Sequence, residues 1–85
     1  NNGMMLTQGS TIKKQVHQCL LDFESSLNKV VSDVDCEDAH RFISNTYEEA
    51  RLTLLNANLS QHKKEYYQRV KTLTKEALDK LGSCD

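Results

Sequence analysis

The stretch that decides the fold is IKKQVHQCLLDFESSLNKVVSDV, residues 12–34. Its apolar side chains recur every three or four residues, which keeps them on one face of an α-helix; they are Val16, Leu20, Phe23, Leu27, Val30 and Val34, with Ile12 one turn earlier. Alternating steps of four and three are also typical of helices that pack side by side in a coiled coil. The stretch predicts one long helix over residues 11–34, preceded by a flexible tail of residues 1–10.

A second amphipathic segment follows directly. Asp35 is a suitable helix N-cap, and Glu37 and Asp38 place negative charge in the first turn, where the helix dipole favours it. These features predict a helix over residues 36–57. Its inner stripe contains three alanines, so a neighbouring helix can approach closely; the stripe consists of Ala39, Ile43, Thr46, Ala50, Leu54 and Ala57.

The third amphipathic segment begins after NANLS. Ser60 is a plausible N-cap, and Gly82 suits the left-handed position that ends many helices. We therefore expect a helix over residues 61–81 and a short tail at residues 83–85. The inner face of this helix is predicted to consist of Tyr66, Val70, Leu73, Ala77 and Leu81.

These three segments predict an all-α fold. The chain has 85 residues, no proline, and glycine only at positions 3, 9 and 82, so neither strong helix breaker interrupts the interior. Each helix is apolar on one stripe only, and short connections force sequence neighbours to run antiparallel. The expected architecture is an up-down-up three-helix bundle with coiled-coil-like packing around one seam.

The balance of charge limits the classes of partner. Net charge is −1, which gives no reason to expect nucleic-acid binding, and no apolar run is long enough to span a bilayer. One stripe of the third predicted helix carries Lys64, Lys71 and Lys75. This stripe is either an ordinary solvated face or a basic surface that attracts an acidic partner or an anionic membrane surface.

Four leucines within eight residues raise a separate question. On a continuous helix Leu54 belongs to the core stripe, whereas Leu52, Leu55 and Leu59 fall on the opposite side as a ridge. Such a ridge is what a partner helix or a second copy recognises. The alternatives are that the helix ends near Leu54, so that Leu55 and Leu59 fold over the open end of the bundle, or that parts of a longer protein cover them.

The three cysteines allow more than one interpretation. An odd number favours a reduced, cytoplasmic protein, in which Cys19 beside the core stripe is a small buried hydrophobe. The up-down-up topology nevertheless brings Cys36 close to Cys84. That proximity allows a disulfide in a secreted protein, or a zinc site with His40 and Asp85, although no paired Cys-x-x-Cys motif supports the metal. We expect no metal and no cofactor.

The sequence favours an interaction module over an enzyme. It contains no glycine-rich phosphate loop and no supported Ser/His/Asp or Cys/His set. Length and helical periodicity resemble the short three-helix N-terminal domains of membrane-trafficking proteins and other helical adaptor modules, and this resemblance implies binding of helices or peptides. The expected function is therefore non-enzymatic protein–protein interaction or regulation, through a partner's amphipathic helix or by self-association. The alternatives are a small secreted helical protein stabilised by Cys36–Cys84, and a lipid or small-molecule carrier.

Overall fold

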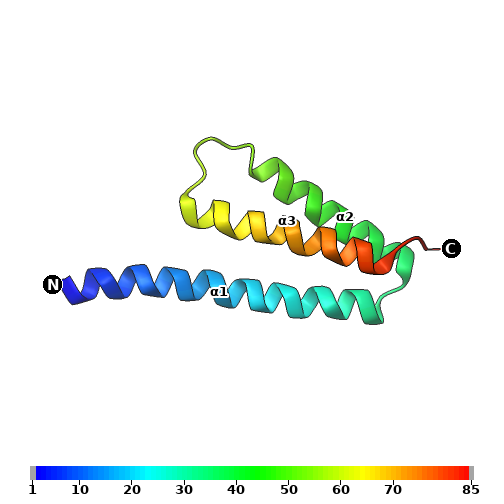
Figure 1. Ribbon diagram of the computed structural model, residues 1–85, viewed down its shortest axis with the longest axis horizontal. Helices are drawn as coiled ribbons and strands as arrows, with labels where there is room; N and C mark the ends of the chain where they lie inside the picture. Colours follow the sequence, from blue (N-terminus) through cyan, green and yellow to red (C-terminus); the bar gives the residue numbers. More distant parts are fainter. Residues whose placement is uncertain (1, 85) are drawn as a thin grey trace.

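The computed structural model describes the backbone of residues 2–84 and the side chains of residues 11–84. This part of the chain forms three helices: α1 spans Asn2–Asp33, α2 spans Cys36–Thr53 and α3 spans Gln61–Leu81. The helices run up, down and up, so that α1 and α3 are parallel and α2 is antiparallel to both (Figure 1). The prediction of an all-α three-helix bundle is confirmed.

Helix α1 begins much earlier than the sequence predicts. The backbone is helical from Asn2, so the predicted start near residue 11 and the predicted tail over residues 1–10 are wrong for residues 2–10, while Asn1 lies outside the described residues. The two glycines of this segment cost the helix about 1 kcal/mol each relative to alanine. Extending an existing helix is much easier than nucleating one, and the methionines and leucine between the glycines are good helix formers.

Helix α2 ends at Thr53, four residues before the predicted end at Ala57. The cause is local hydrogen bonding by asparagine, which competes with the helix. The backbone N–H of Asn58 donates to Oδ1 of Asn56 at 3.0 Å, and the N–H of Leu59 donates to the Asn56 carbonyl at 3.2 Å. Residues 54–60 therefore form a compact connection.

Helix α3 spans the predicted residues and is capped at both ends. The Ser60 hydroxyl accepts a hydrogen bond from the N–H of Lys63 at 3.3 Å, which satisfies a first-turn amide that has no partner within the helix. At the other end Gly82 takes a φ of 62°, and its N–H donates to the Leu78 carbonyl at 3.0 Å. This left-handed conformation suits glycine because it lacks a Cβ atom.

The hydrophobic core lies towards the end of the molecule where α1 connects to α2. Its centre combines residues of all three helices: Leu27, Ile43, Leu73 and Ala77. Around it pack the partly buried Phe23, Val30, Val31, Leu78 and Leu81. Near this end the predicted stripes are correct except for Val34, which follows the end of α1 and is 42% exposed. Further along α1, Ile12 is 41% exposed, and Ala57 is exposed in the connection. Thr74, which the stripe pattern did not include, is fully buried.

The bundle is open rather than compact. Helix α1 packs along α3 and scarcely touches α2, and Figure 1 shows it extending well past the start of α3. The radius of gyration is 15.5 Å and the extents are 59 × 27 × 15 Å. A compact domain of this length has a radius of about 12 Å. One flank of the apolar stripe of α1 is consequently left without a covering helix.

Candidate functional site

The main candidate site is a groove between α1 and the first turns of α3, with a volume of about 280 Å³. We call it the α1/α3 groove. Four residues of each helix line it: Ile12, Gln15, Val16 and Cys19 from α1, and His62, Lys63, Tyr66 and Tyr67 from α3. Its walls are mainly apolar, and the polar groups of glutamine, histidine and lysine stand at the margin.

The groove is open because α2 is too short to cover it. Helix α2 stops at Thr53, and Figure 1 shows its end falling short of the level at which α3 begins. Within the described residues 2–84, no third helix therefore packs over this part of α1 and α3. Ile12 is 41% exposed as a result, and Cys19 is exposed as well. The prediction that Cys19 is a small buried hydrophobe is wrong for this reason.

Two tyrosines form the α3 wall of the groove. The rings of Tyr66 and Tyr67 meet edge to face, with centroids 5.1 Å apart and planes at 84°. Partial burial raises the pKa of the Tyr66 hydroxyl above its ordinary value, and the nearby Cys19 and Tyr67 add to the rise because their negative forms disfavour a phenolate. The groove thus combines aromatic surface, two phenolic hydroxyls and a free thiol, a mixture suited to contact with another polypeptide.

The predicted leucine ridge does not exist as a continuous helical surface. Leu52 is on the last turn of α2, whereas Leu55 and Leu59 lie in the connection after the helix ends. Leu52 and Leu55 are 53% and 71% exposed, and Leu59 is half-buried. The alternative of an early helix end is correct, but only Leu59 turns partly inward. Leu55 points mainly to solvent.

We expect Leu52→Glu and Leu55→Glu to leave the fold intact. Both side chains are mainly in water, so each substitution is expected to change the free energy of unfolding by less than about 1 kcal/mol. Denaturant unfolding followed by circular dichroism measures this. Leu59→Glu is the control, because burying its carboxylate is expected to cost more. Unfolding of the Leu55 variant would contradict this description of the connection.

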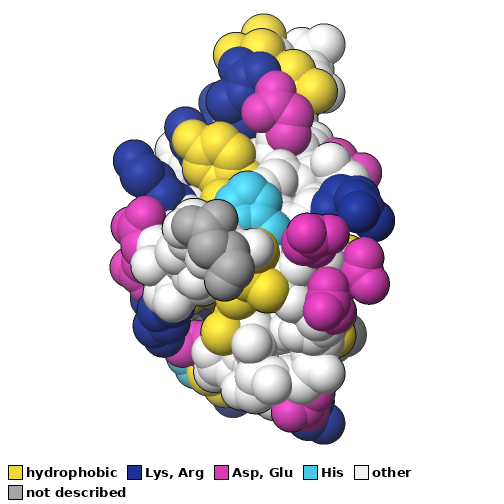
Figure 2. Space-filling model, turned by 90° about the vertical axis from the view of Figure 1, so that its right-hand side faces the viewer, with side chains coloured by type: hydrophobic (Ala, Val, Ile, Leu, Met, Phe, Trp, Pro, Cys, Tyr) yellow, Lys and Arg dark blue, Asp and Glu magenta, His cyan; other side chains and the backbone are white. Residues whose placement is uncertain are grey.

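The predicted basic surface has acidic side chains beside it. Lys64 and Lys71 are half-buried and Lys75 is exposed. Lys71 and Lys75 line a shallow hollow together with Glu76 and Asp79. Figure 2, which views the end of the molecule that holds the α1–α2 connection, also shows acidic and basic side chains interspersed. These lysines therefore do not form a surface of one sign.

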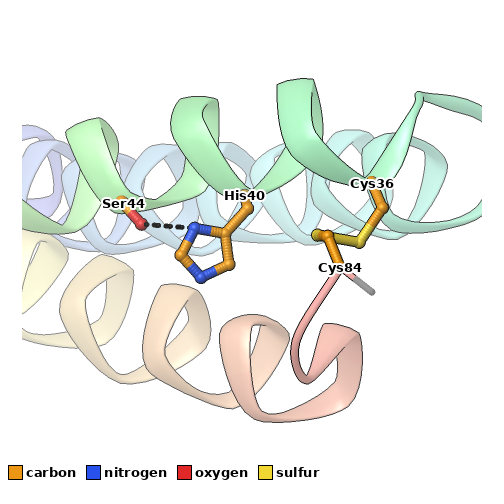
Figure 3. The surroundings of a disulfide bond; sticks show 4 residues. All are labelled: Cys36, His40, Ser44 and Cys84. Atoms are coloured by element: carbon orange, nitrogen blue, oxygen red, sulfur yellow. Dashed lines mark hydrogen bonds between the residues drawn. A yellow bond between two sulfur atoms is a disulfide. The ribbon is translucent and has the colours of Figure 1, made fainter.

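A disulfide joins Cys36, at the start of α2, to Cys84, two residues beyond Gly82. The two Cα atoms are 5.6 Å apart, and Figure 3 shows the bond clamping the open ends of α2 and α3. The predicted proximity of these cysteines is thus correct, and the expectation of three reduced thiols is wrong. Cys84 is also not part of a free tail, and Asp85 lies outside the described residues.

His40 lies one turn beyond the disulfide and faces an open hollow of about 540 Å³ (Figure 3). Its Nδ1 is 3.4 Å from the hydroxyl of Ser44, an ordinary contact between positions four apart on a helix. The sulfurs are bonded to each other and are not available as thiolate ligands for zinc. Within residues 11–84 the structure brings together no group of three side chains suited to holding a metal ion.

We compared the chain with known families, proteins and structures. No family model, curated protein or solved structure matches this chain significantly. Over the described residues, none of the helices has the length and apolar character that crossing a membrane requires.

Sequence reasoning missed the α1/α3 groove. The stripe pattern assigned Ile12, Val16 and Tyr66 to the core because it assumed three helices that cover one another along their whole length. The predicted lengths gave no signal for it, because helices over residues 11–34, 36–57 and 61–81 are nearly equal. The difference in length appears only in the structure, where α1 begins at Asn2 and α2 ends at Thr53.

Proposed function

We propose that this chain is a non-enzymatic interaction module that binds a helical segment of another polypeptide in the α1/α3 groove, in an oxidising compartment. The observation that carries this proposal is the uncovered apolar flank of α1 beside the tyrosines of α3. An amphipathic helix in that position occupies the place that α2 leaves empty and buries Ile12. Helix-in-groove binding of this kind uses apolar anchors three or four residues apart.

The margin of the groove indicates the charge of the bound helix. Lys63 and His62 stand on the α3 side, at the N-terminal end of that helix, where the dipole adds positive potential. A bound helix with acidic residues flanking its apolar stripe is therefore favoured. The groove volume of about 280 Å³ is at the lower limit of small-molecule pockets, which supports a peptide ligand over a lipid or small-molecule carrier function.

The disulfide supports the oxidising compartment. Structural disulfides persist in secreted and lumenal proteins and are rare in the cytosol, where thiols are kept reduced. Cys36–Cys84 closes the α2–α3 hairpin at the start of α2 and the end of α3. The disulfide therefore supports a secreted or lumenal location over the cytoplasmic one that the odd number of cysteines first favoured.

Site-specific photo-crosslinking tests the proposal. A photoreactive phenylalanine analogue replaces Ile12 in one variant and Leu21 in the other, and each variant is irradiated in an extract of the cells that produce the protein. The two positions are similarly exposed, at 41% and 47%, but nine residues apart, which is half a turn around the helix. We expect a discrete adduct from position 12 and none from position 21. Equal adducts from both positions, or none from position 12, would contradict groove binding.

A further inference from the structure

We propose that the occupant of the α1/α3 groove is a second copy of this chain, with the two α1 helices antiparallel and the two Cys19 sulfurs joined by a disulfide. This inference rests on the proposed function, because it names the partner for the same groove. Three observations support it: the position of the remaining thiol, the distribution of charge along α1 on either side of it, and the position of Lys63 along the groove.

The thiol lies where a two-fold axis can pass. Cys36 and Cys84 are bonded to each other, which leaves Cys19 as the third cysteine of the chain, free and exposed. It lines the groove together with Ile12 and Val16. In a symmetric dimer, a residue on the axis meets the same residue of the other copy. A single exposed cysteine on an apolar surface can therefore pair with itself without any change of the fold.

Charge along α1 reverses sign at Cys19. The eight residues before it, 11–18, include Lys13 and Lys14 and no acidic residue, while Asp22 and Glu24 follow it and no basic residue occurs before position 29. An antiparallel pairing centred on Cys19 brings the basic segment of each copy to the acidic segment of the other. Parallel pairing in register would instead place like charges together. Charge complementarity thus selects the antiparallel arrangement.

Lys63 gives this arrangement a specific ion pair. Lys63 lines the groove one turn of α3 before Tyr66, and Cys19 of α1 is near enough to Tyr66 to act on its hydroxyl electrostatically. Because α1 and α3 run parallel, we place Lys63 about one turn before Cys19 along α1, near Val16. Asp22 is exposed on α1 three residues after Cys19. In an antiparallel pair centred on Cys19, the position three residues before Cys19 in one copy lies beside the position three residues after it in the other. Lys63 of each copy therefore faces Asp22 of the second copy. Two symmetric ion pairs then flank the central sulfurs.

The covalent bond forms by thiol–disulfide exchange with a low-molecular-weight disulfide such as oxidised glutathione. The Cys19 thiolate of one copy attacks a glutathione sulfur, its S–S bond breaks, and one glutathione leaves. The Cys19 thiolate of the second copy then attacks the Cys19 sulfur and displaces the second glutathione. Two protein thiols are oxidised, one glutathione disulfide is reduced to two thiols, and the protons pass to the released glutathione.

The first test uses the full chain with Cys36–Cys84 intact and Cys19 reduced. The protein is incubated with oxidised glutathione and examined by non-reducing electrophoresis, followed by mass mapping of the linked peptides. We expect a dimer joined through Cys19, and no dimer from Cys19→Ser. Accumulation of the glutathione adduct of Cys19 without dimer would overturn the proposal.

Charge reversal tests the antiparallel arrangement. We expect Lys63→Glu and Asp22→Lys each to slow dimer formation about five-fold, and the double variant to recover the original rate, because it restores both ion pairs with reversed sign. Lys80→Glu makes the same charge change at the far end of α3 and is expected to leave the rate unchanged. Circular dichroism checks that every variant is folded. Failure of the double variant to recover would overturn the Lys63–Asp22 pairing and the arrangement built on it.

The two proposals fail separately. If the position-12 photo-crosslinker captures a different protein and Cys19 forms no dimer, self-pairing is wrong and groove binding stands. If position 12 gives neither a self-adduct nor any other discrete adduct, both are wrong. A position-12 self-adduct together with the Cys19-linked dimer supports both.

Discussion

Replacing Cys36 and Cys84 by serine is expected to lower the free energy of unfolding by about 4 kcal/mol. The bond joins residues 48 positions apart, and closing a loop of that length removes much of the conformational entropy of the unfolded chain. Small domains have only about 5 kcal/mol or somewhat more to lose. The double variant is therefore expected to be largely unfolded near 37 °C.

Circular dichroism during thermal and guanidinium unfolding measures this effect, with Cys19→Ser as the matched control. Cys19 is exposed and outside the bond, so its replacement is expected to leave stability within about 0.5 kcal/mol of the original. If the double variant unfolds at the same denaturant concentration as the original protein, the clamp at the ends of α2 and α3 contributes little. The entropic argument would then be wrong for this fold.

Ile43→Ala is expected to be the most destabilising single substitution in the core, at about 2–5 kcal/mol. Ile43 is fully buried, and it lies in the cluster that joins Leu27 of α1 to Leu73 of α3. Removing its three outer carbons loses burial in a cluster where side chains of all three helices meet. The core cluster is small, so few neighbouring side chains can move into the cavity that the substitution leaves.

The neighbouring Phe42→Ala is the control for this substitution. Phe42 is on the same helix but 53% exposed, so its truncation is expected to cost less than about 1 kcal/mol despite the larger volume removed. Guanidinium unfolding of both variants gives the comparison. A larger loss for Phe42 than for Ile43 would mean that α2 presents a different face to the core.

The sequence predicted the helices and the core better than the ends and the surface. Ser60 and Gly82 act by local hydrogen bonds and backbone geometry, so their roles at the ends of α3 could be inferred from residue type alone. The end of α2 near Leu54 was predicted only as an alternative to a helix over residues 36–57. The Asn56 side chain accepts a hydrogen bond from the backbone of Asn58, and the periodicity of apolar residues carries no information about such a turn. The leucine ridge was wrong because it depended on the longer helix.

The approach of Cys36 to Cys84 could be predicted from the sequence, whereas the α1/α3 groove could not, and the reason is physical. Topology alone brings the start of α2 beside the end of α3, so the approach of Cys36 and Cys84 follows from the order of the helices. Whether Cys19 is covered depends instead on where α2 stops and how closely it approaches α1. That distance is set by packing of all three helices together, which a single apolar stripe cannot specify.

The flattened shape has a consequence for how substitutions are tolerated. Along its thinnest direction the Cα trace extends 15 Å, which leaves room for two layers of helices, since the Cα atoms of one helix span about 4.6 Å and packed helix axes lie about 8–10 Å apart. Among residues 11–84, seven apolar side chains and Thr74 are shielded from water. At most other positions a substitution is therefore expected to affect stability mainly through helix propensity and solubility. The small set of buried contacts is expected to tolerate far fewer substitutions.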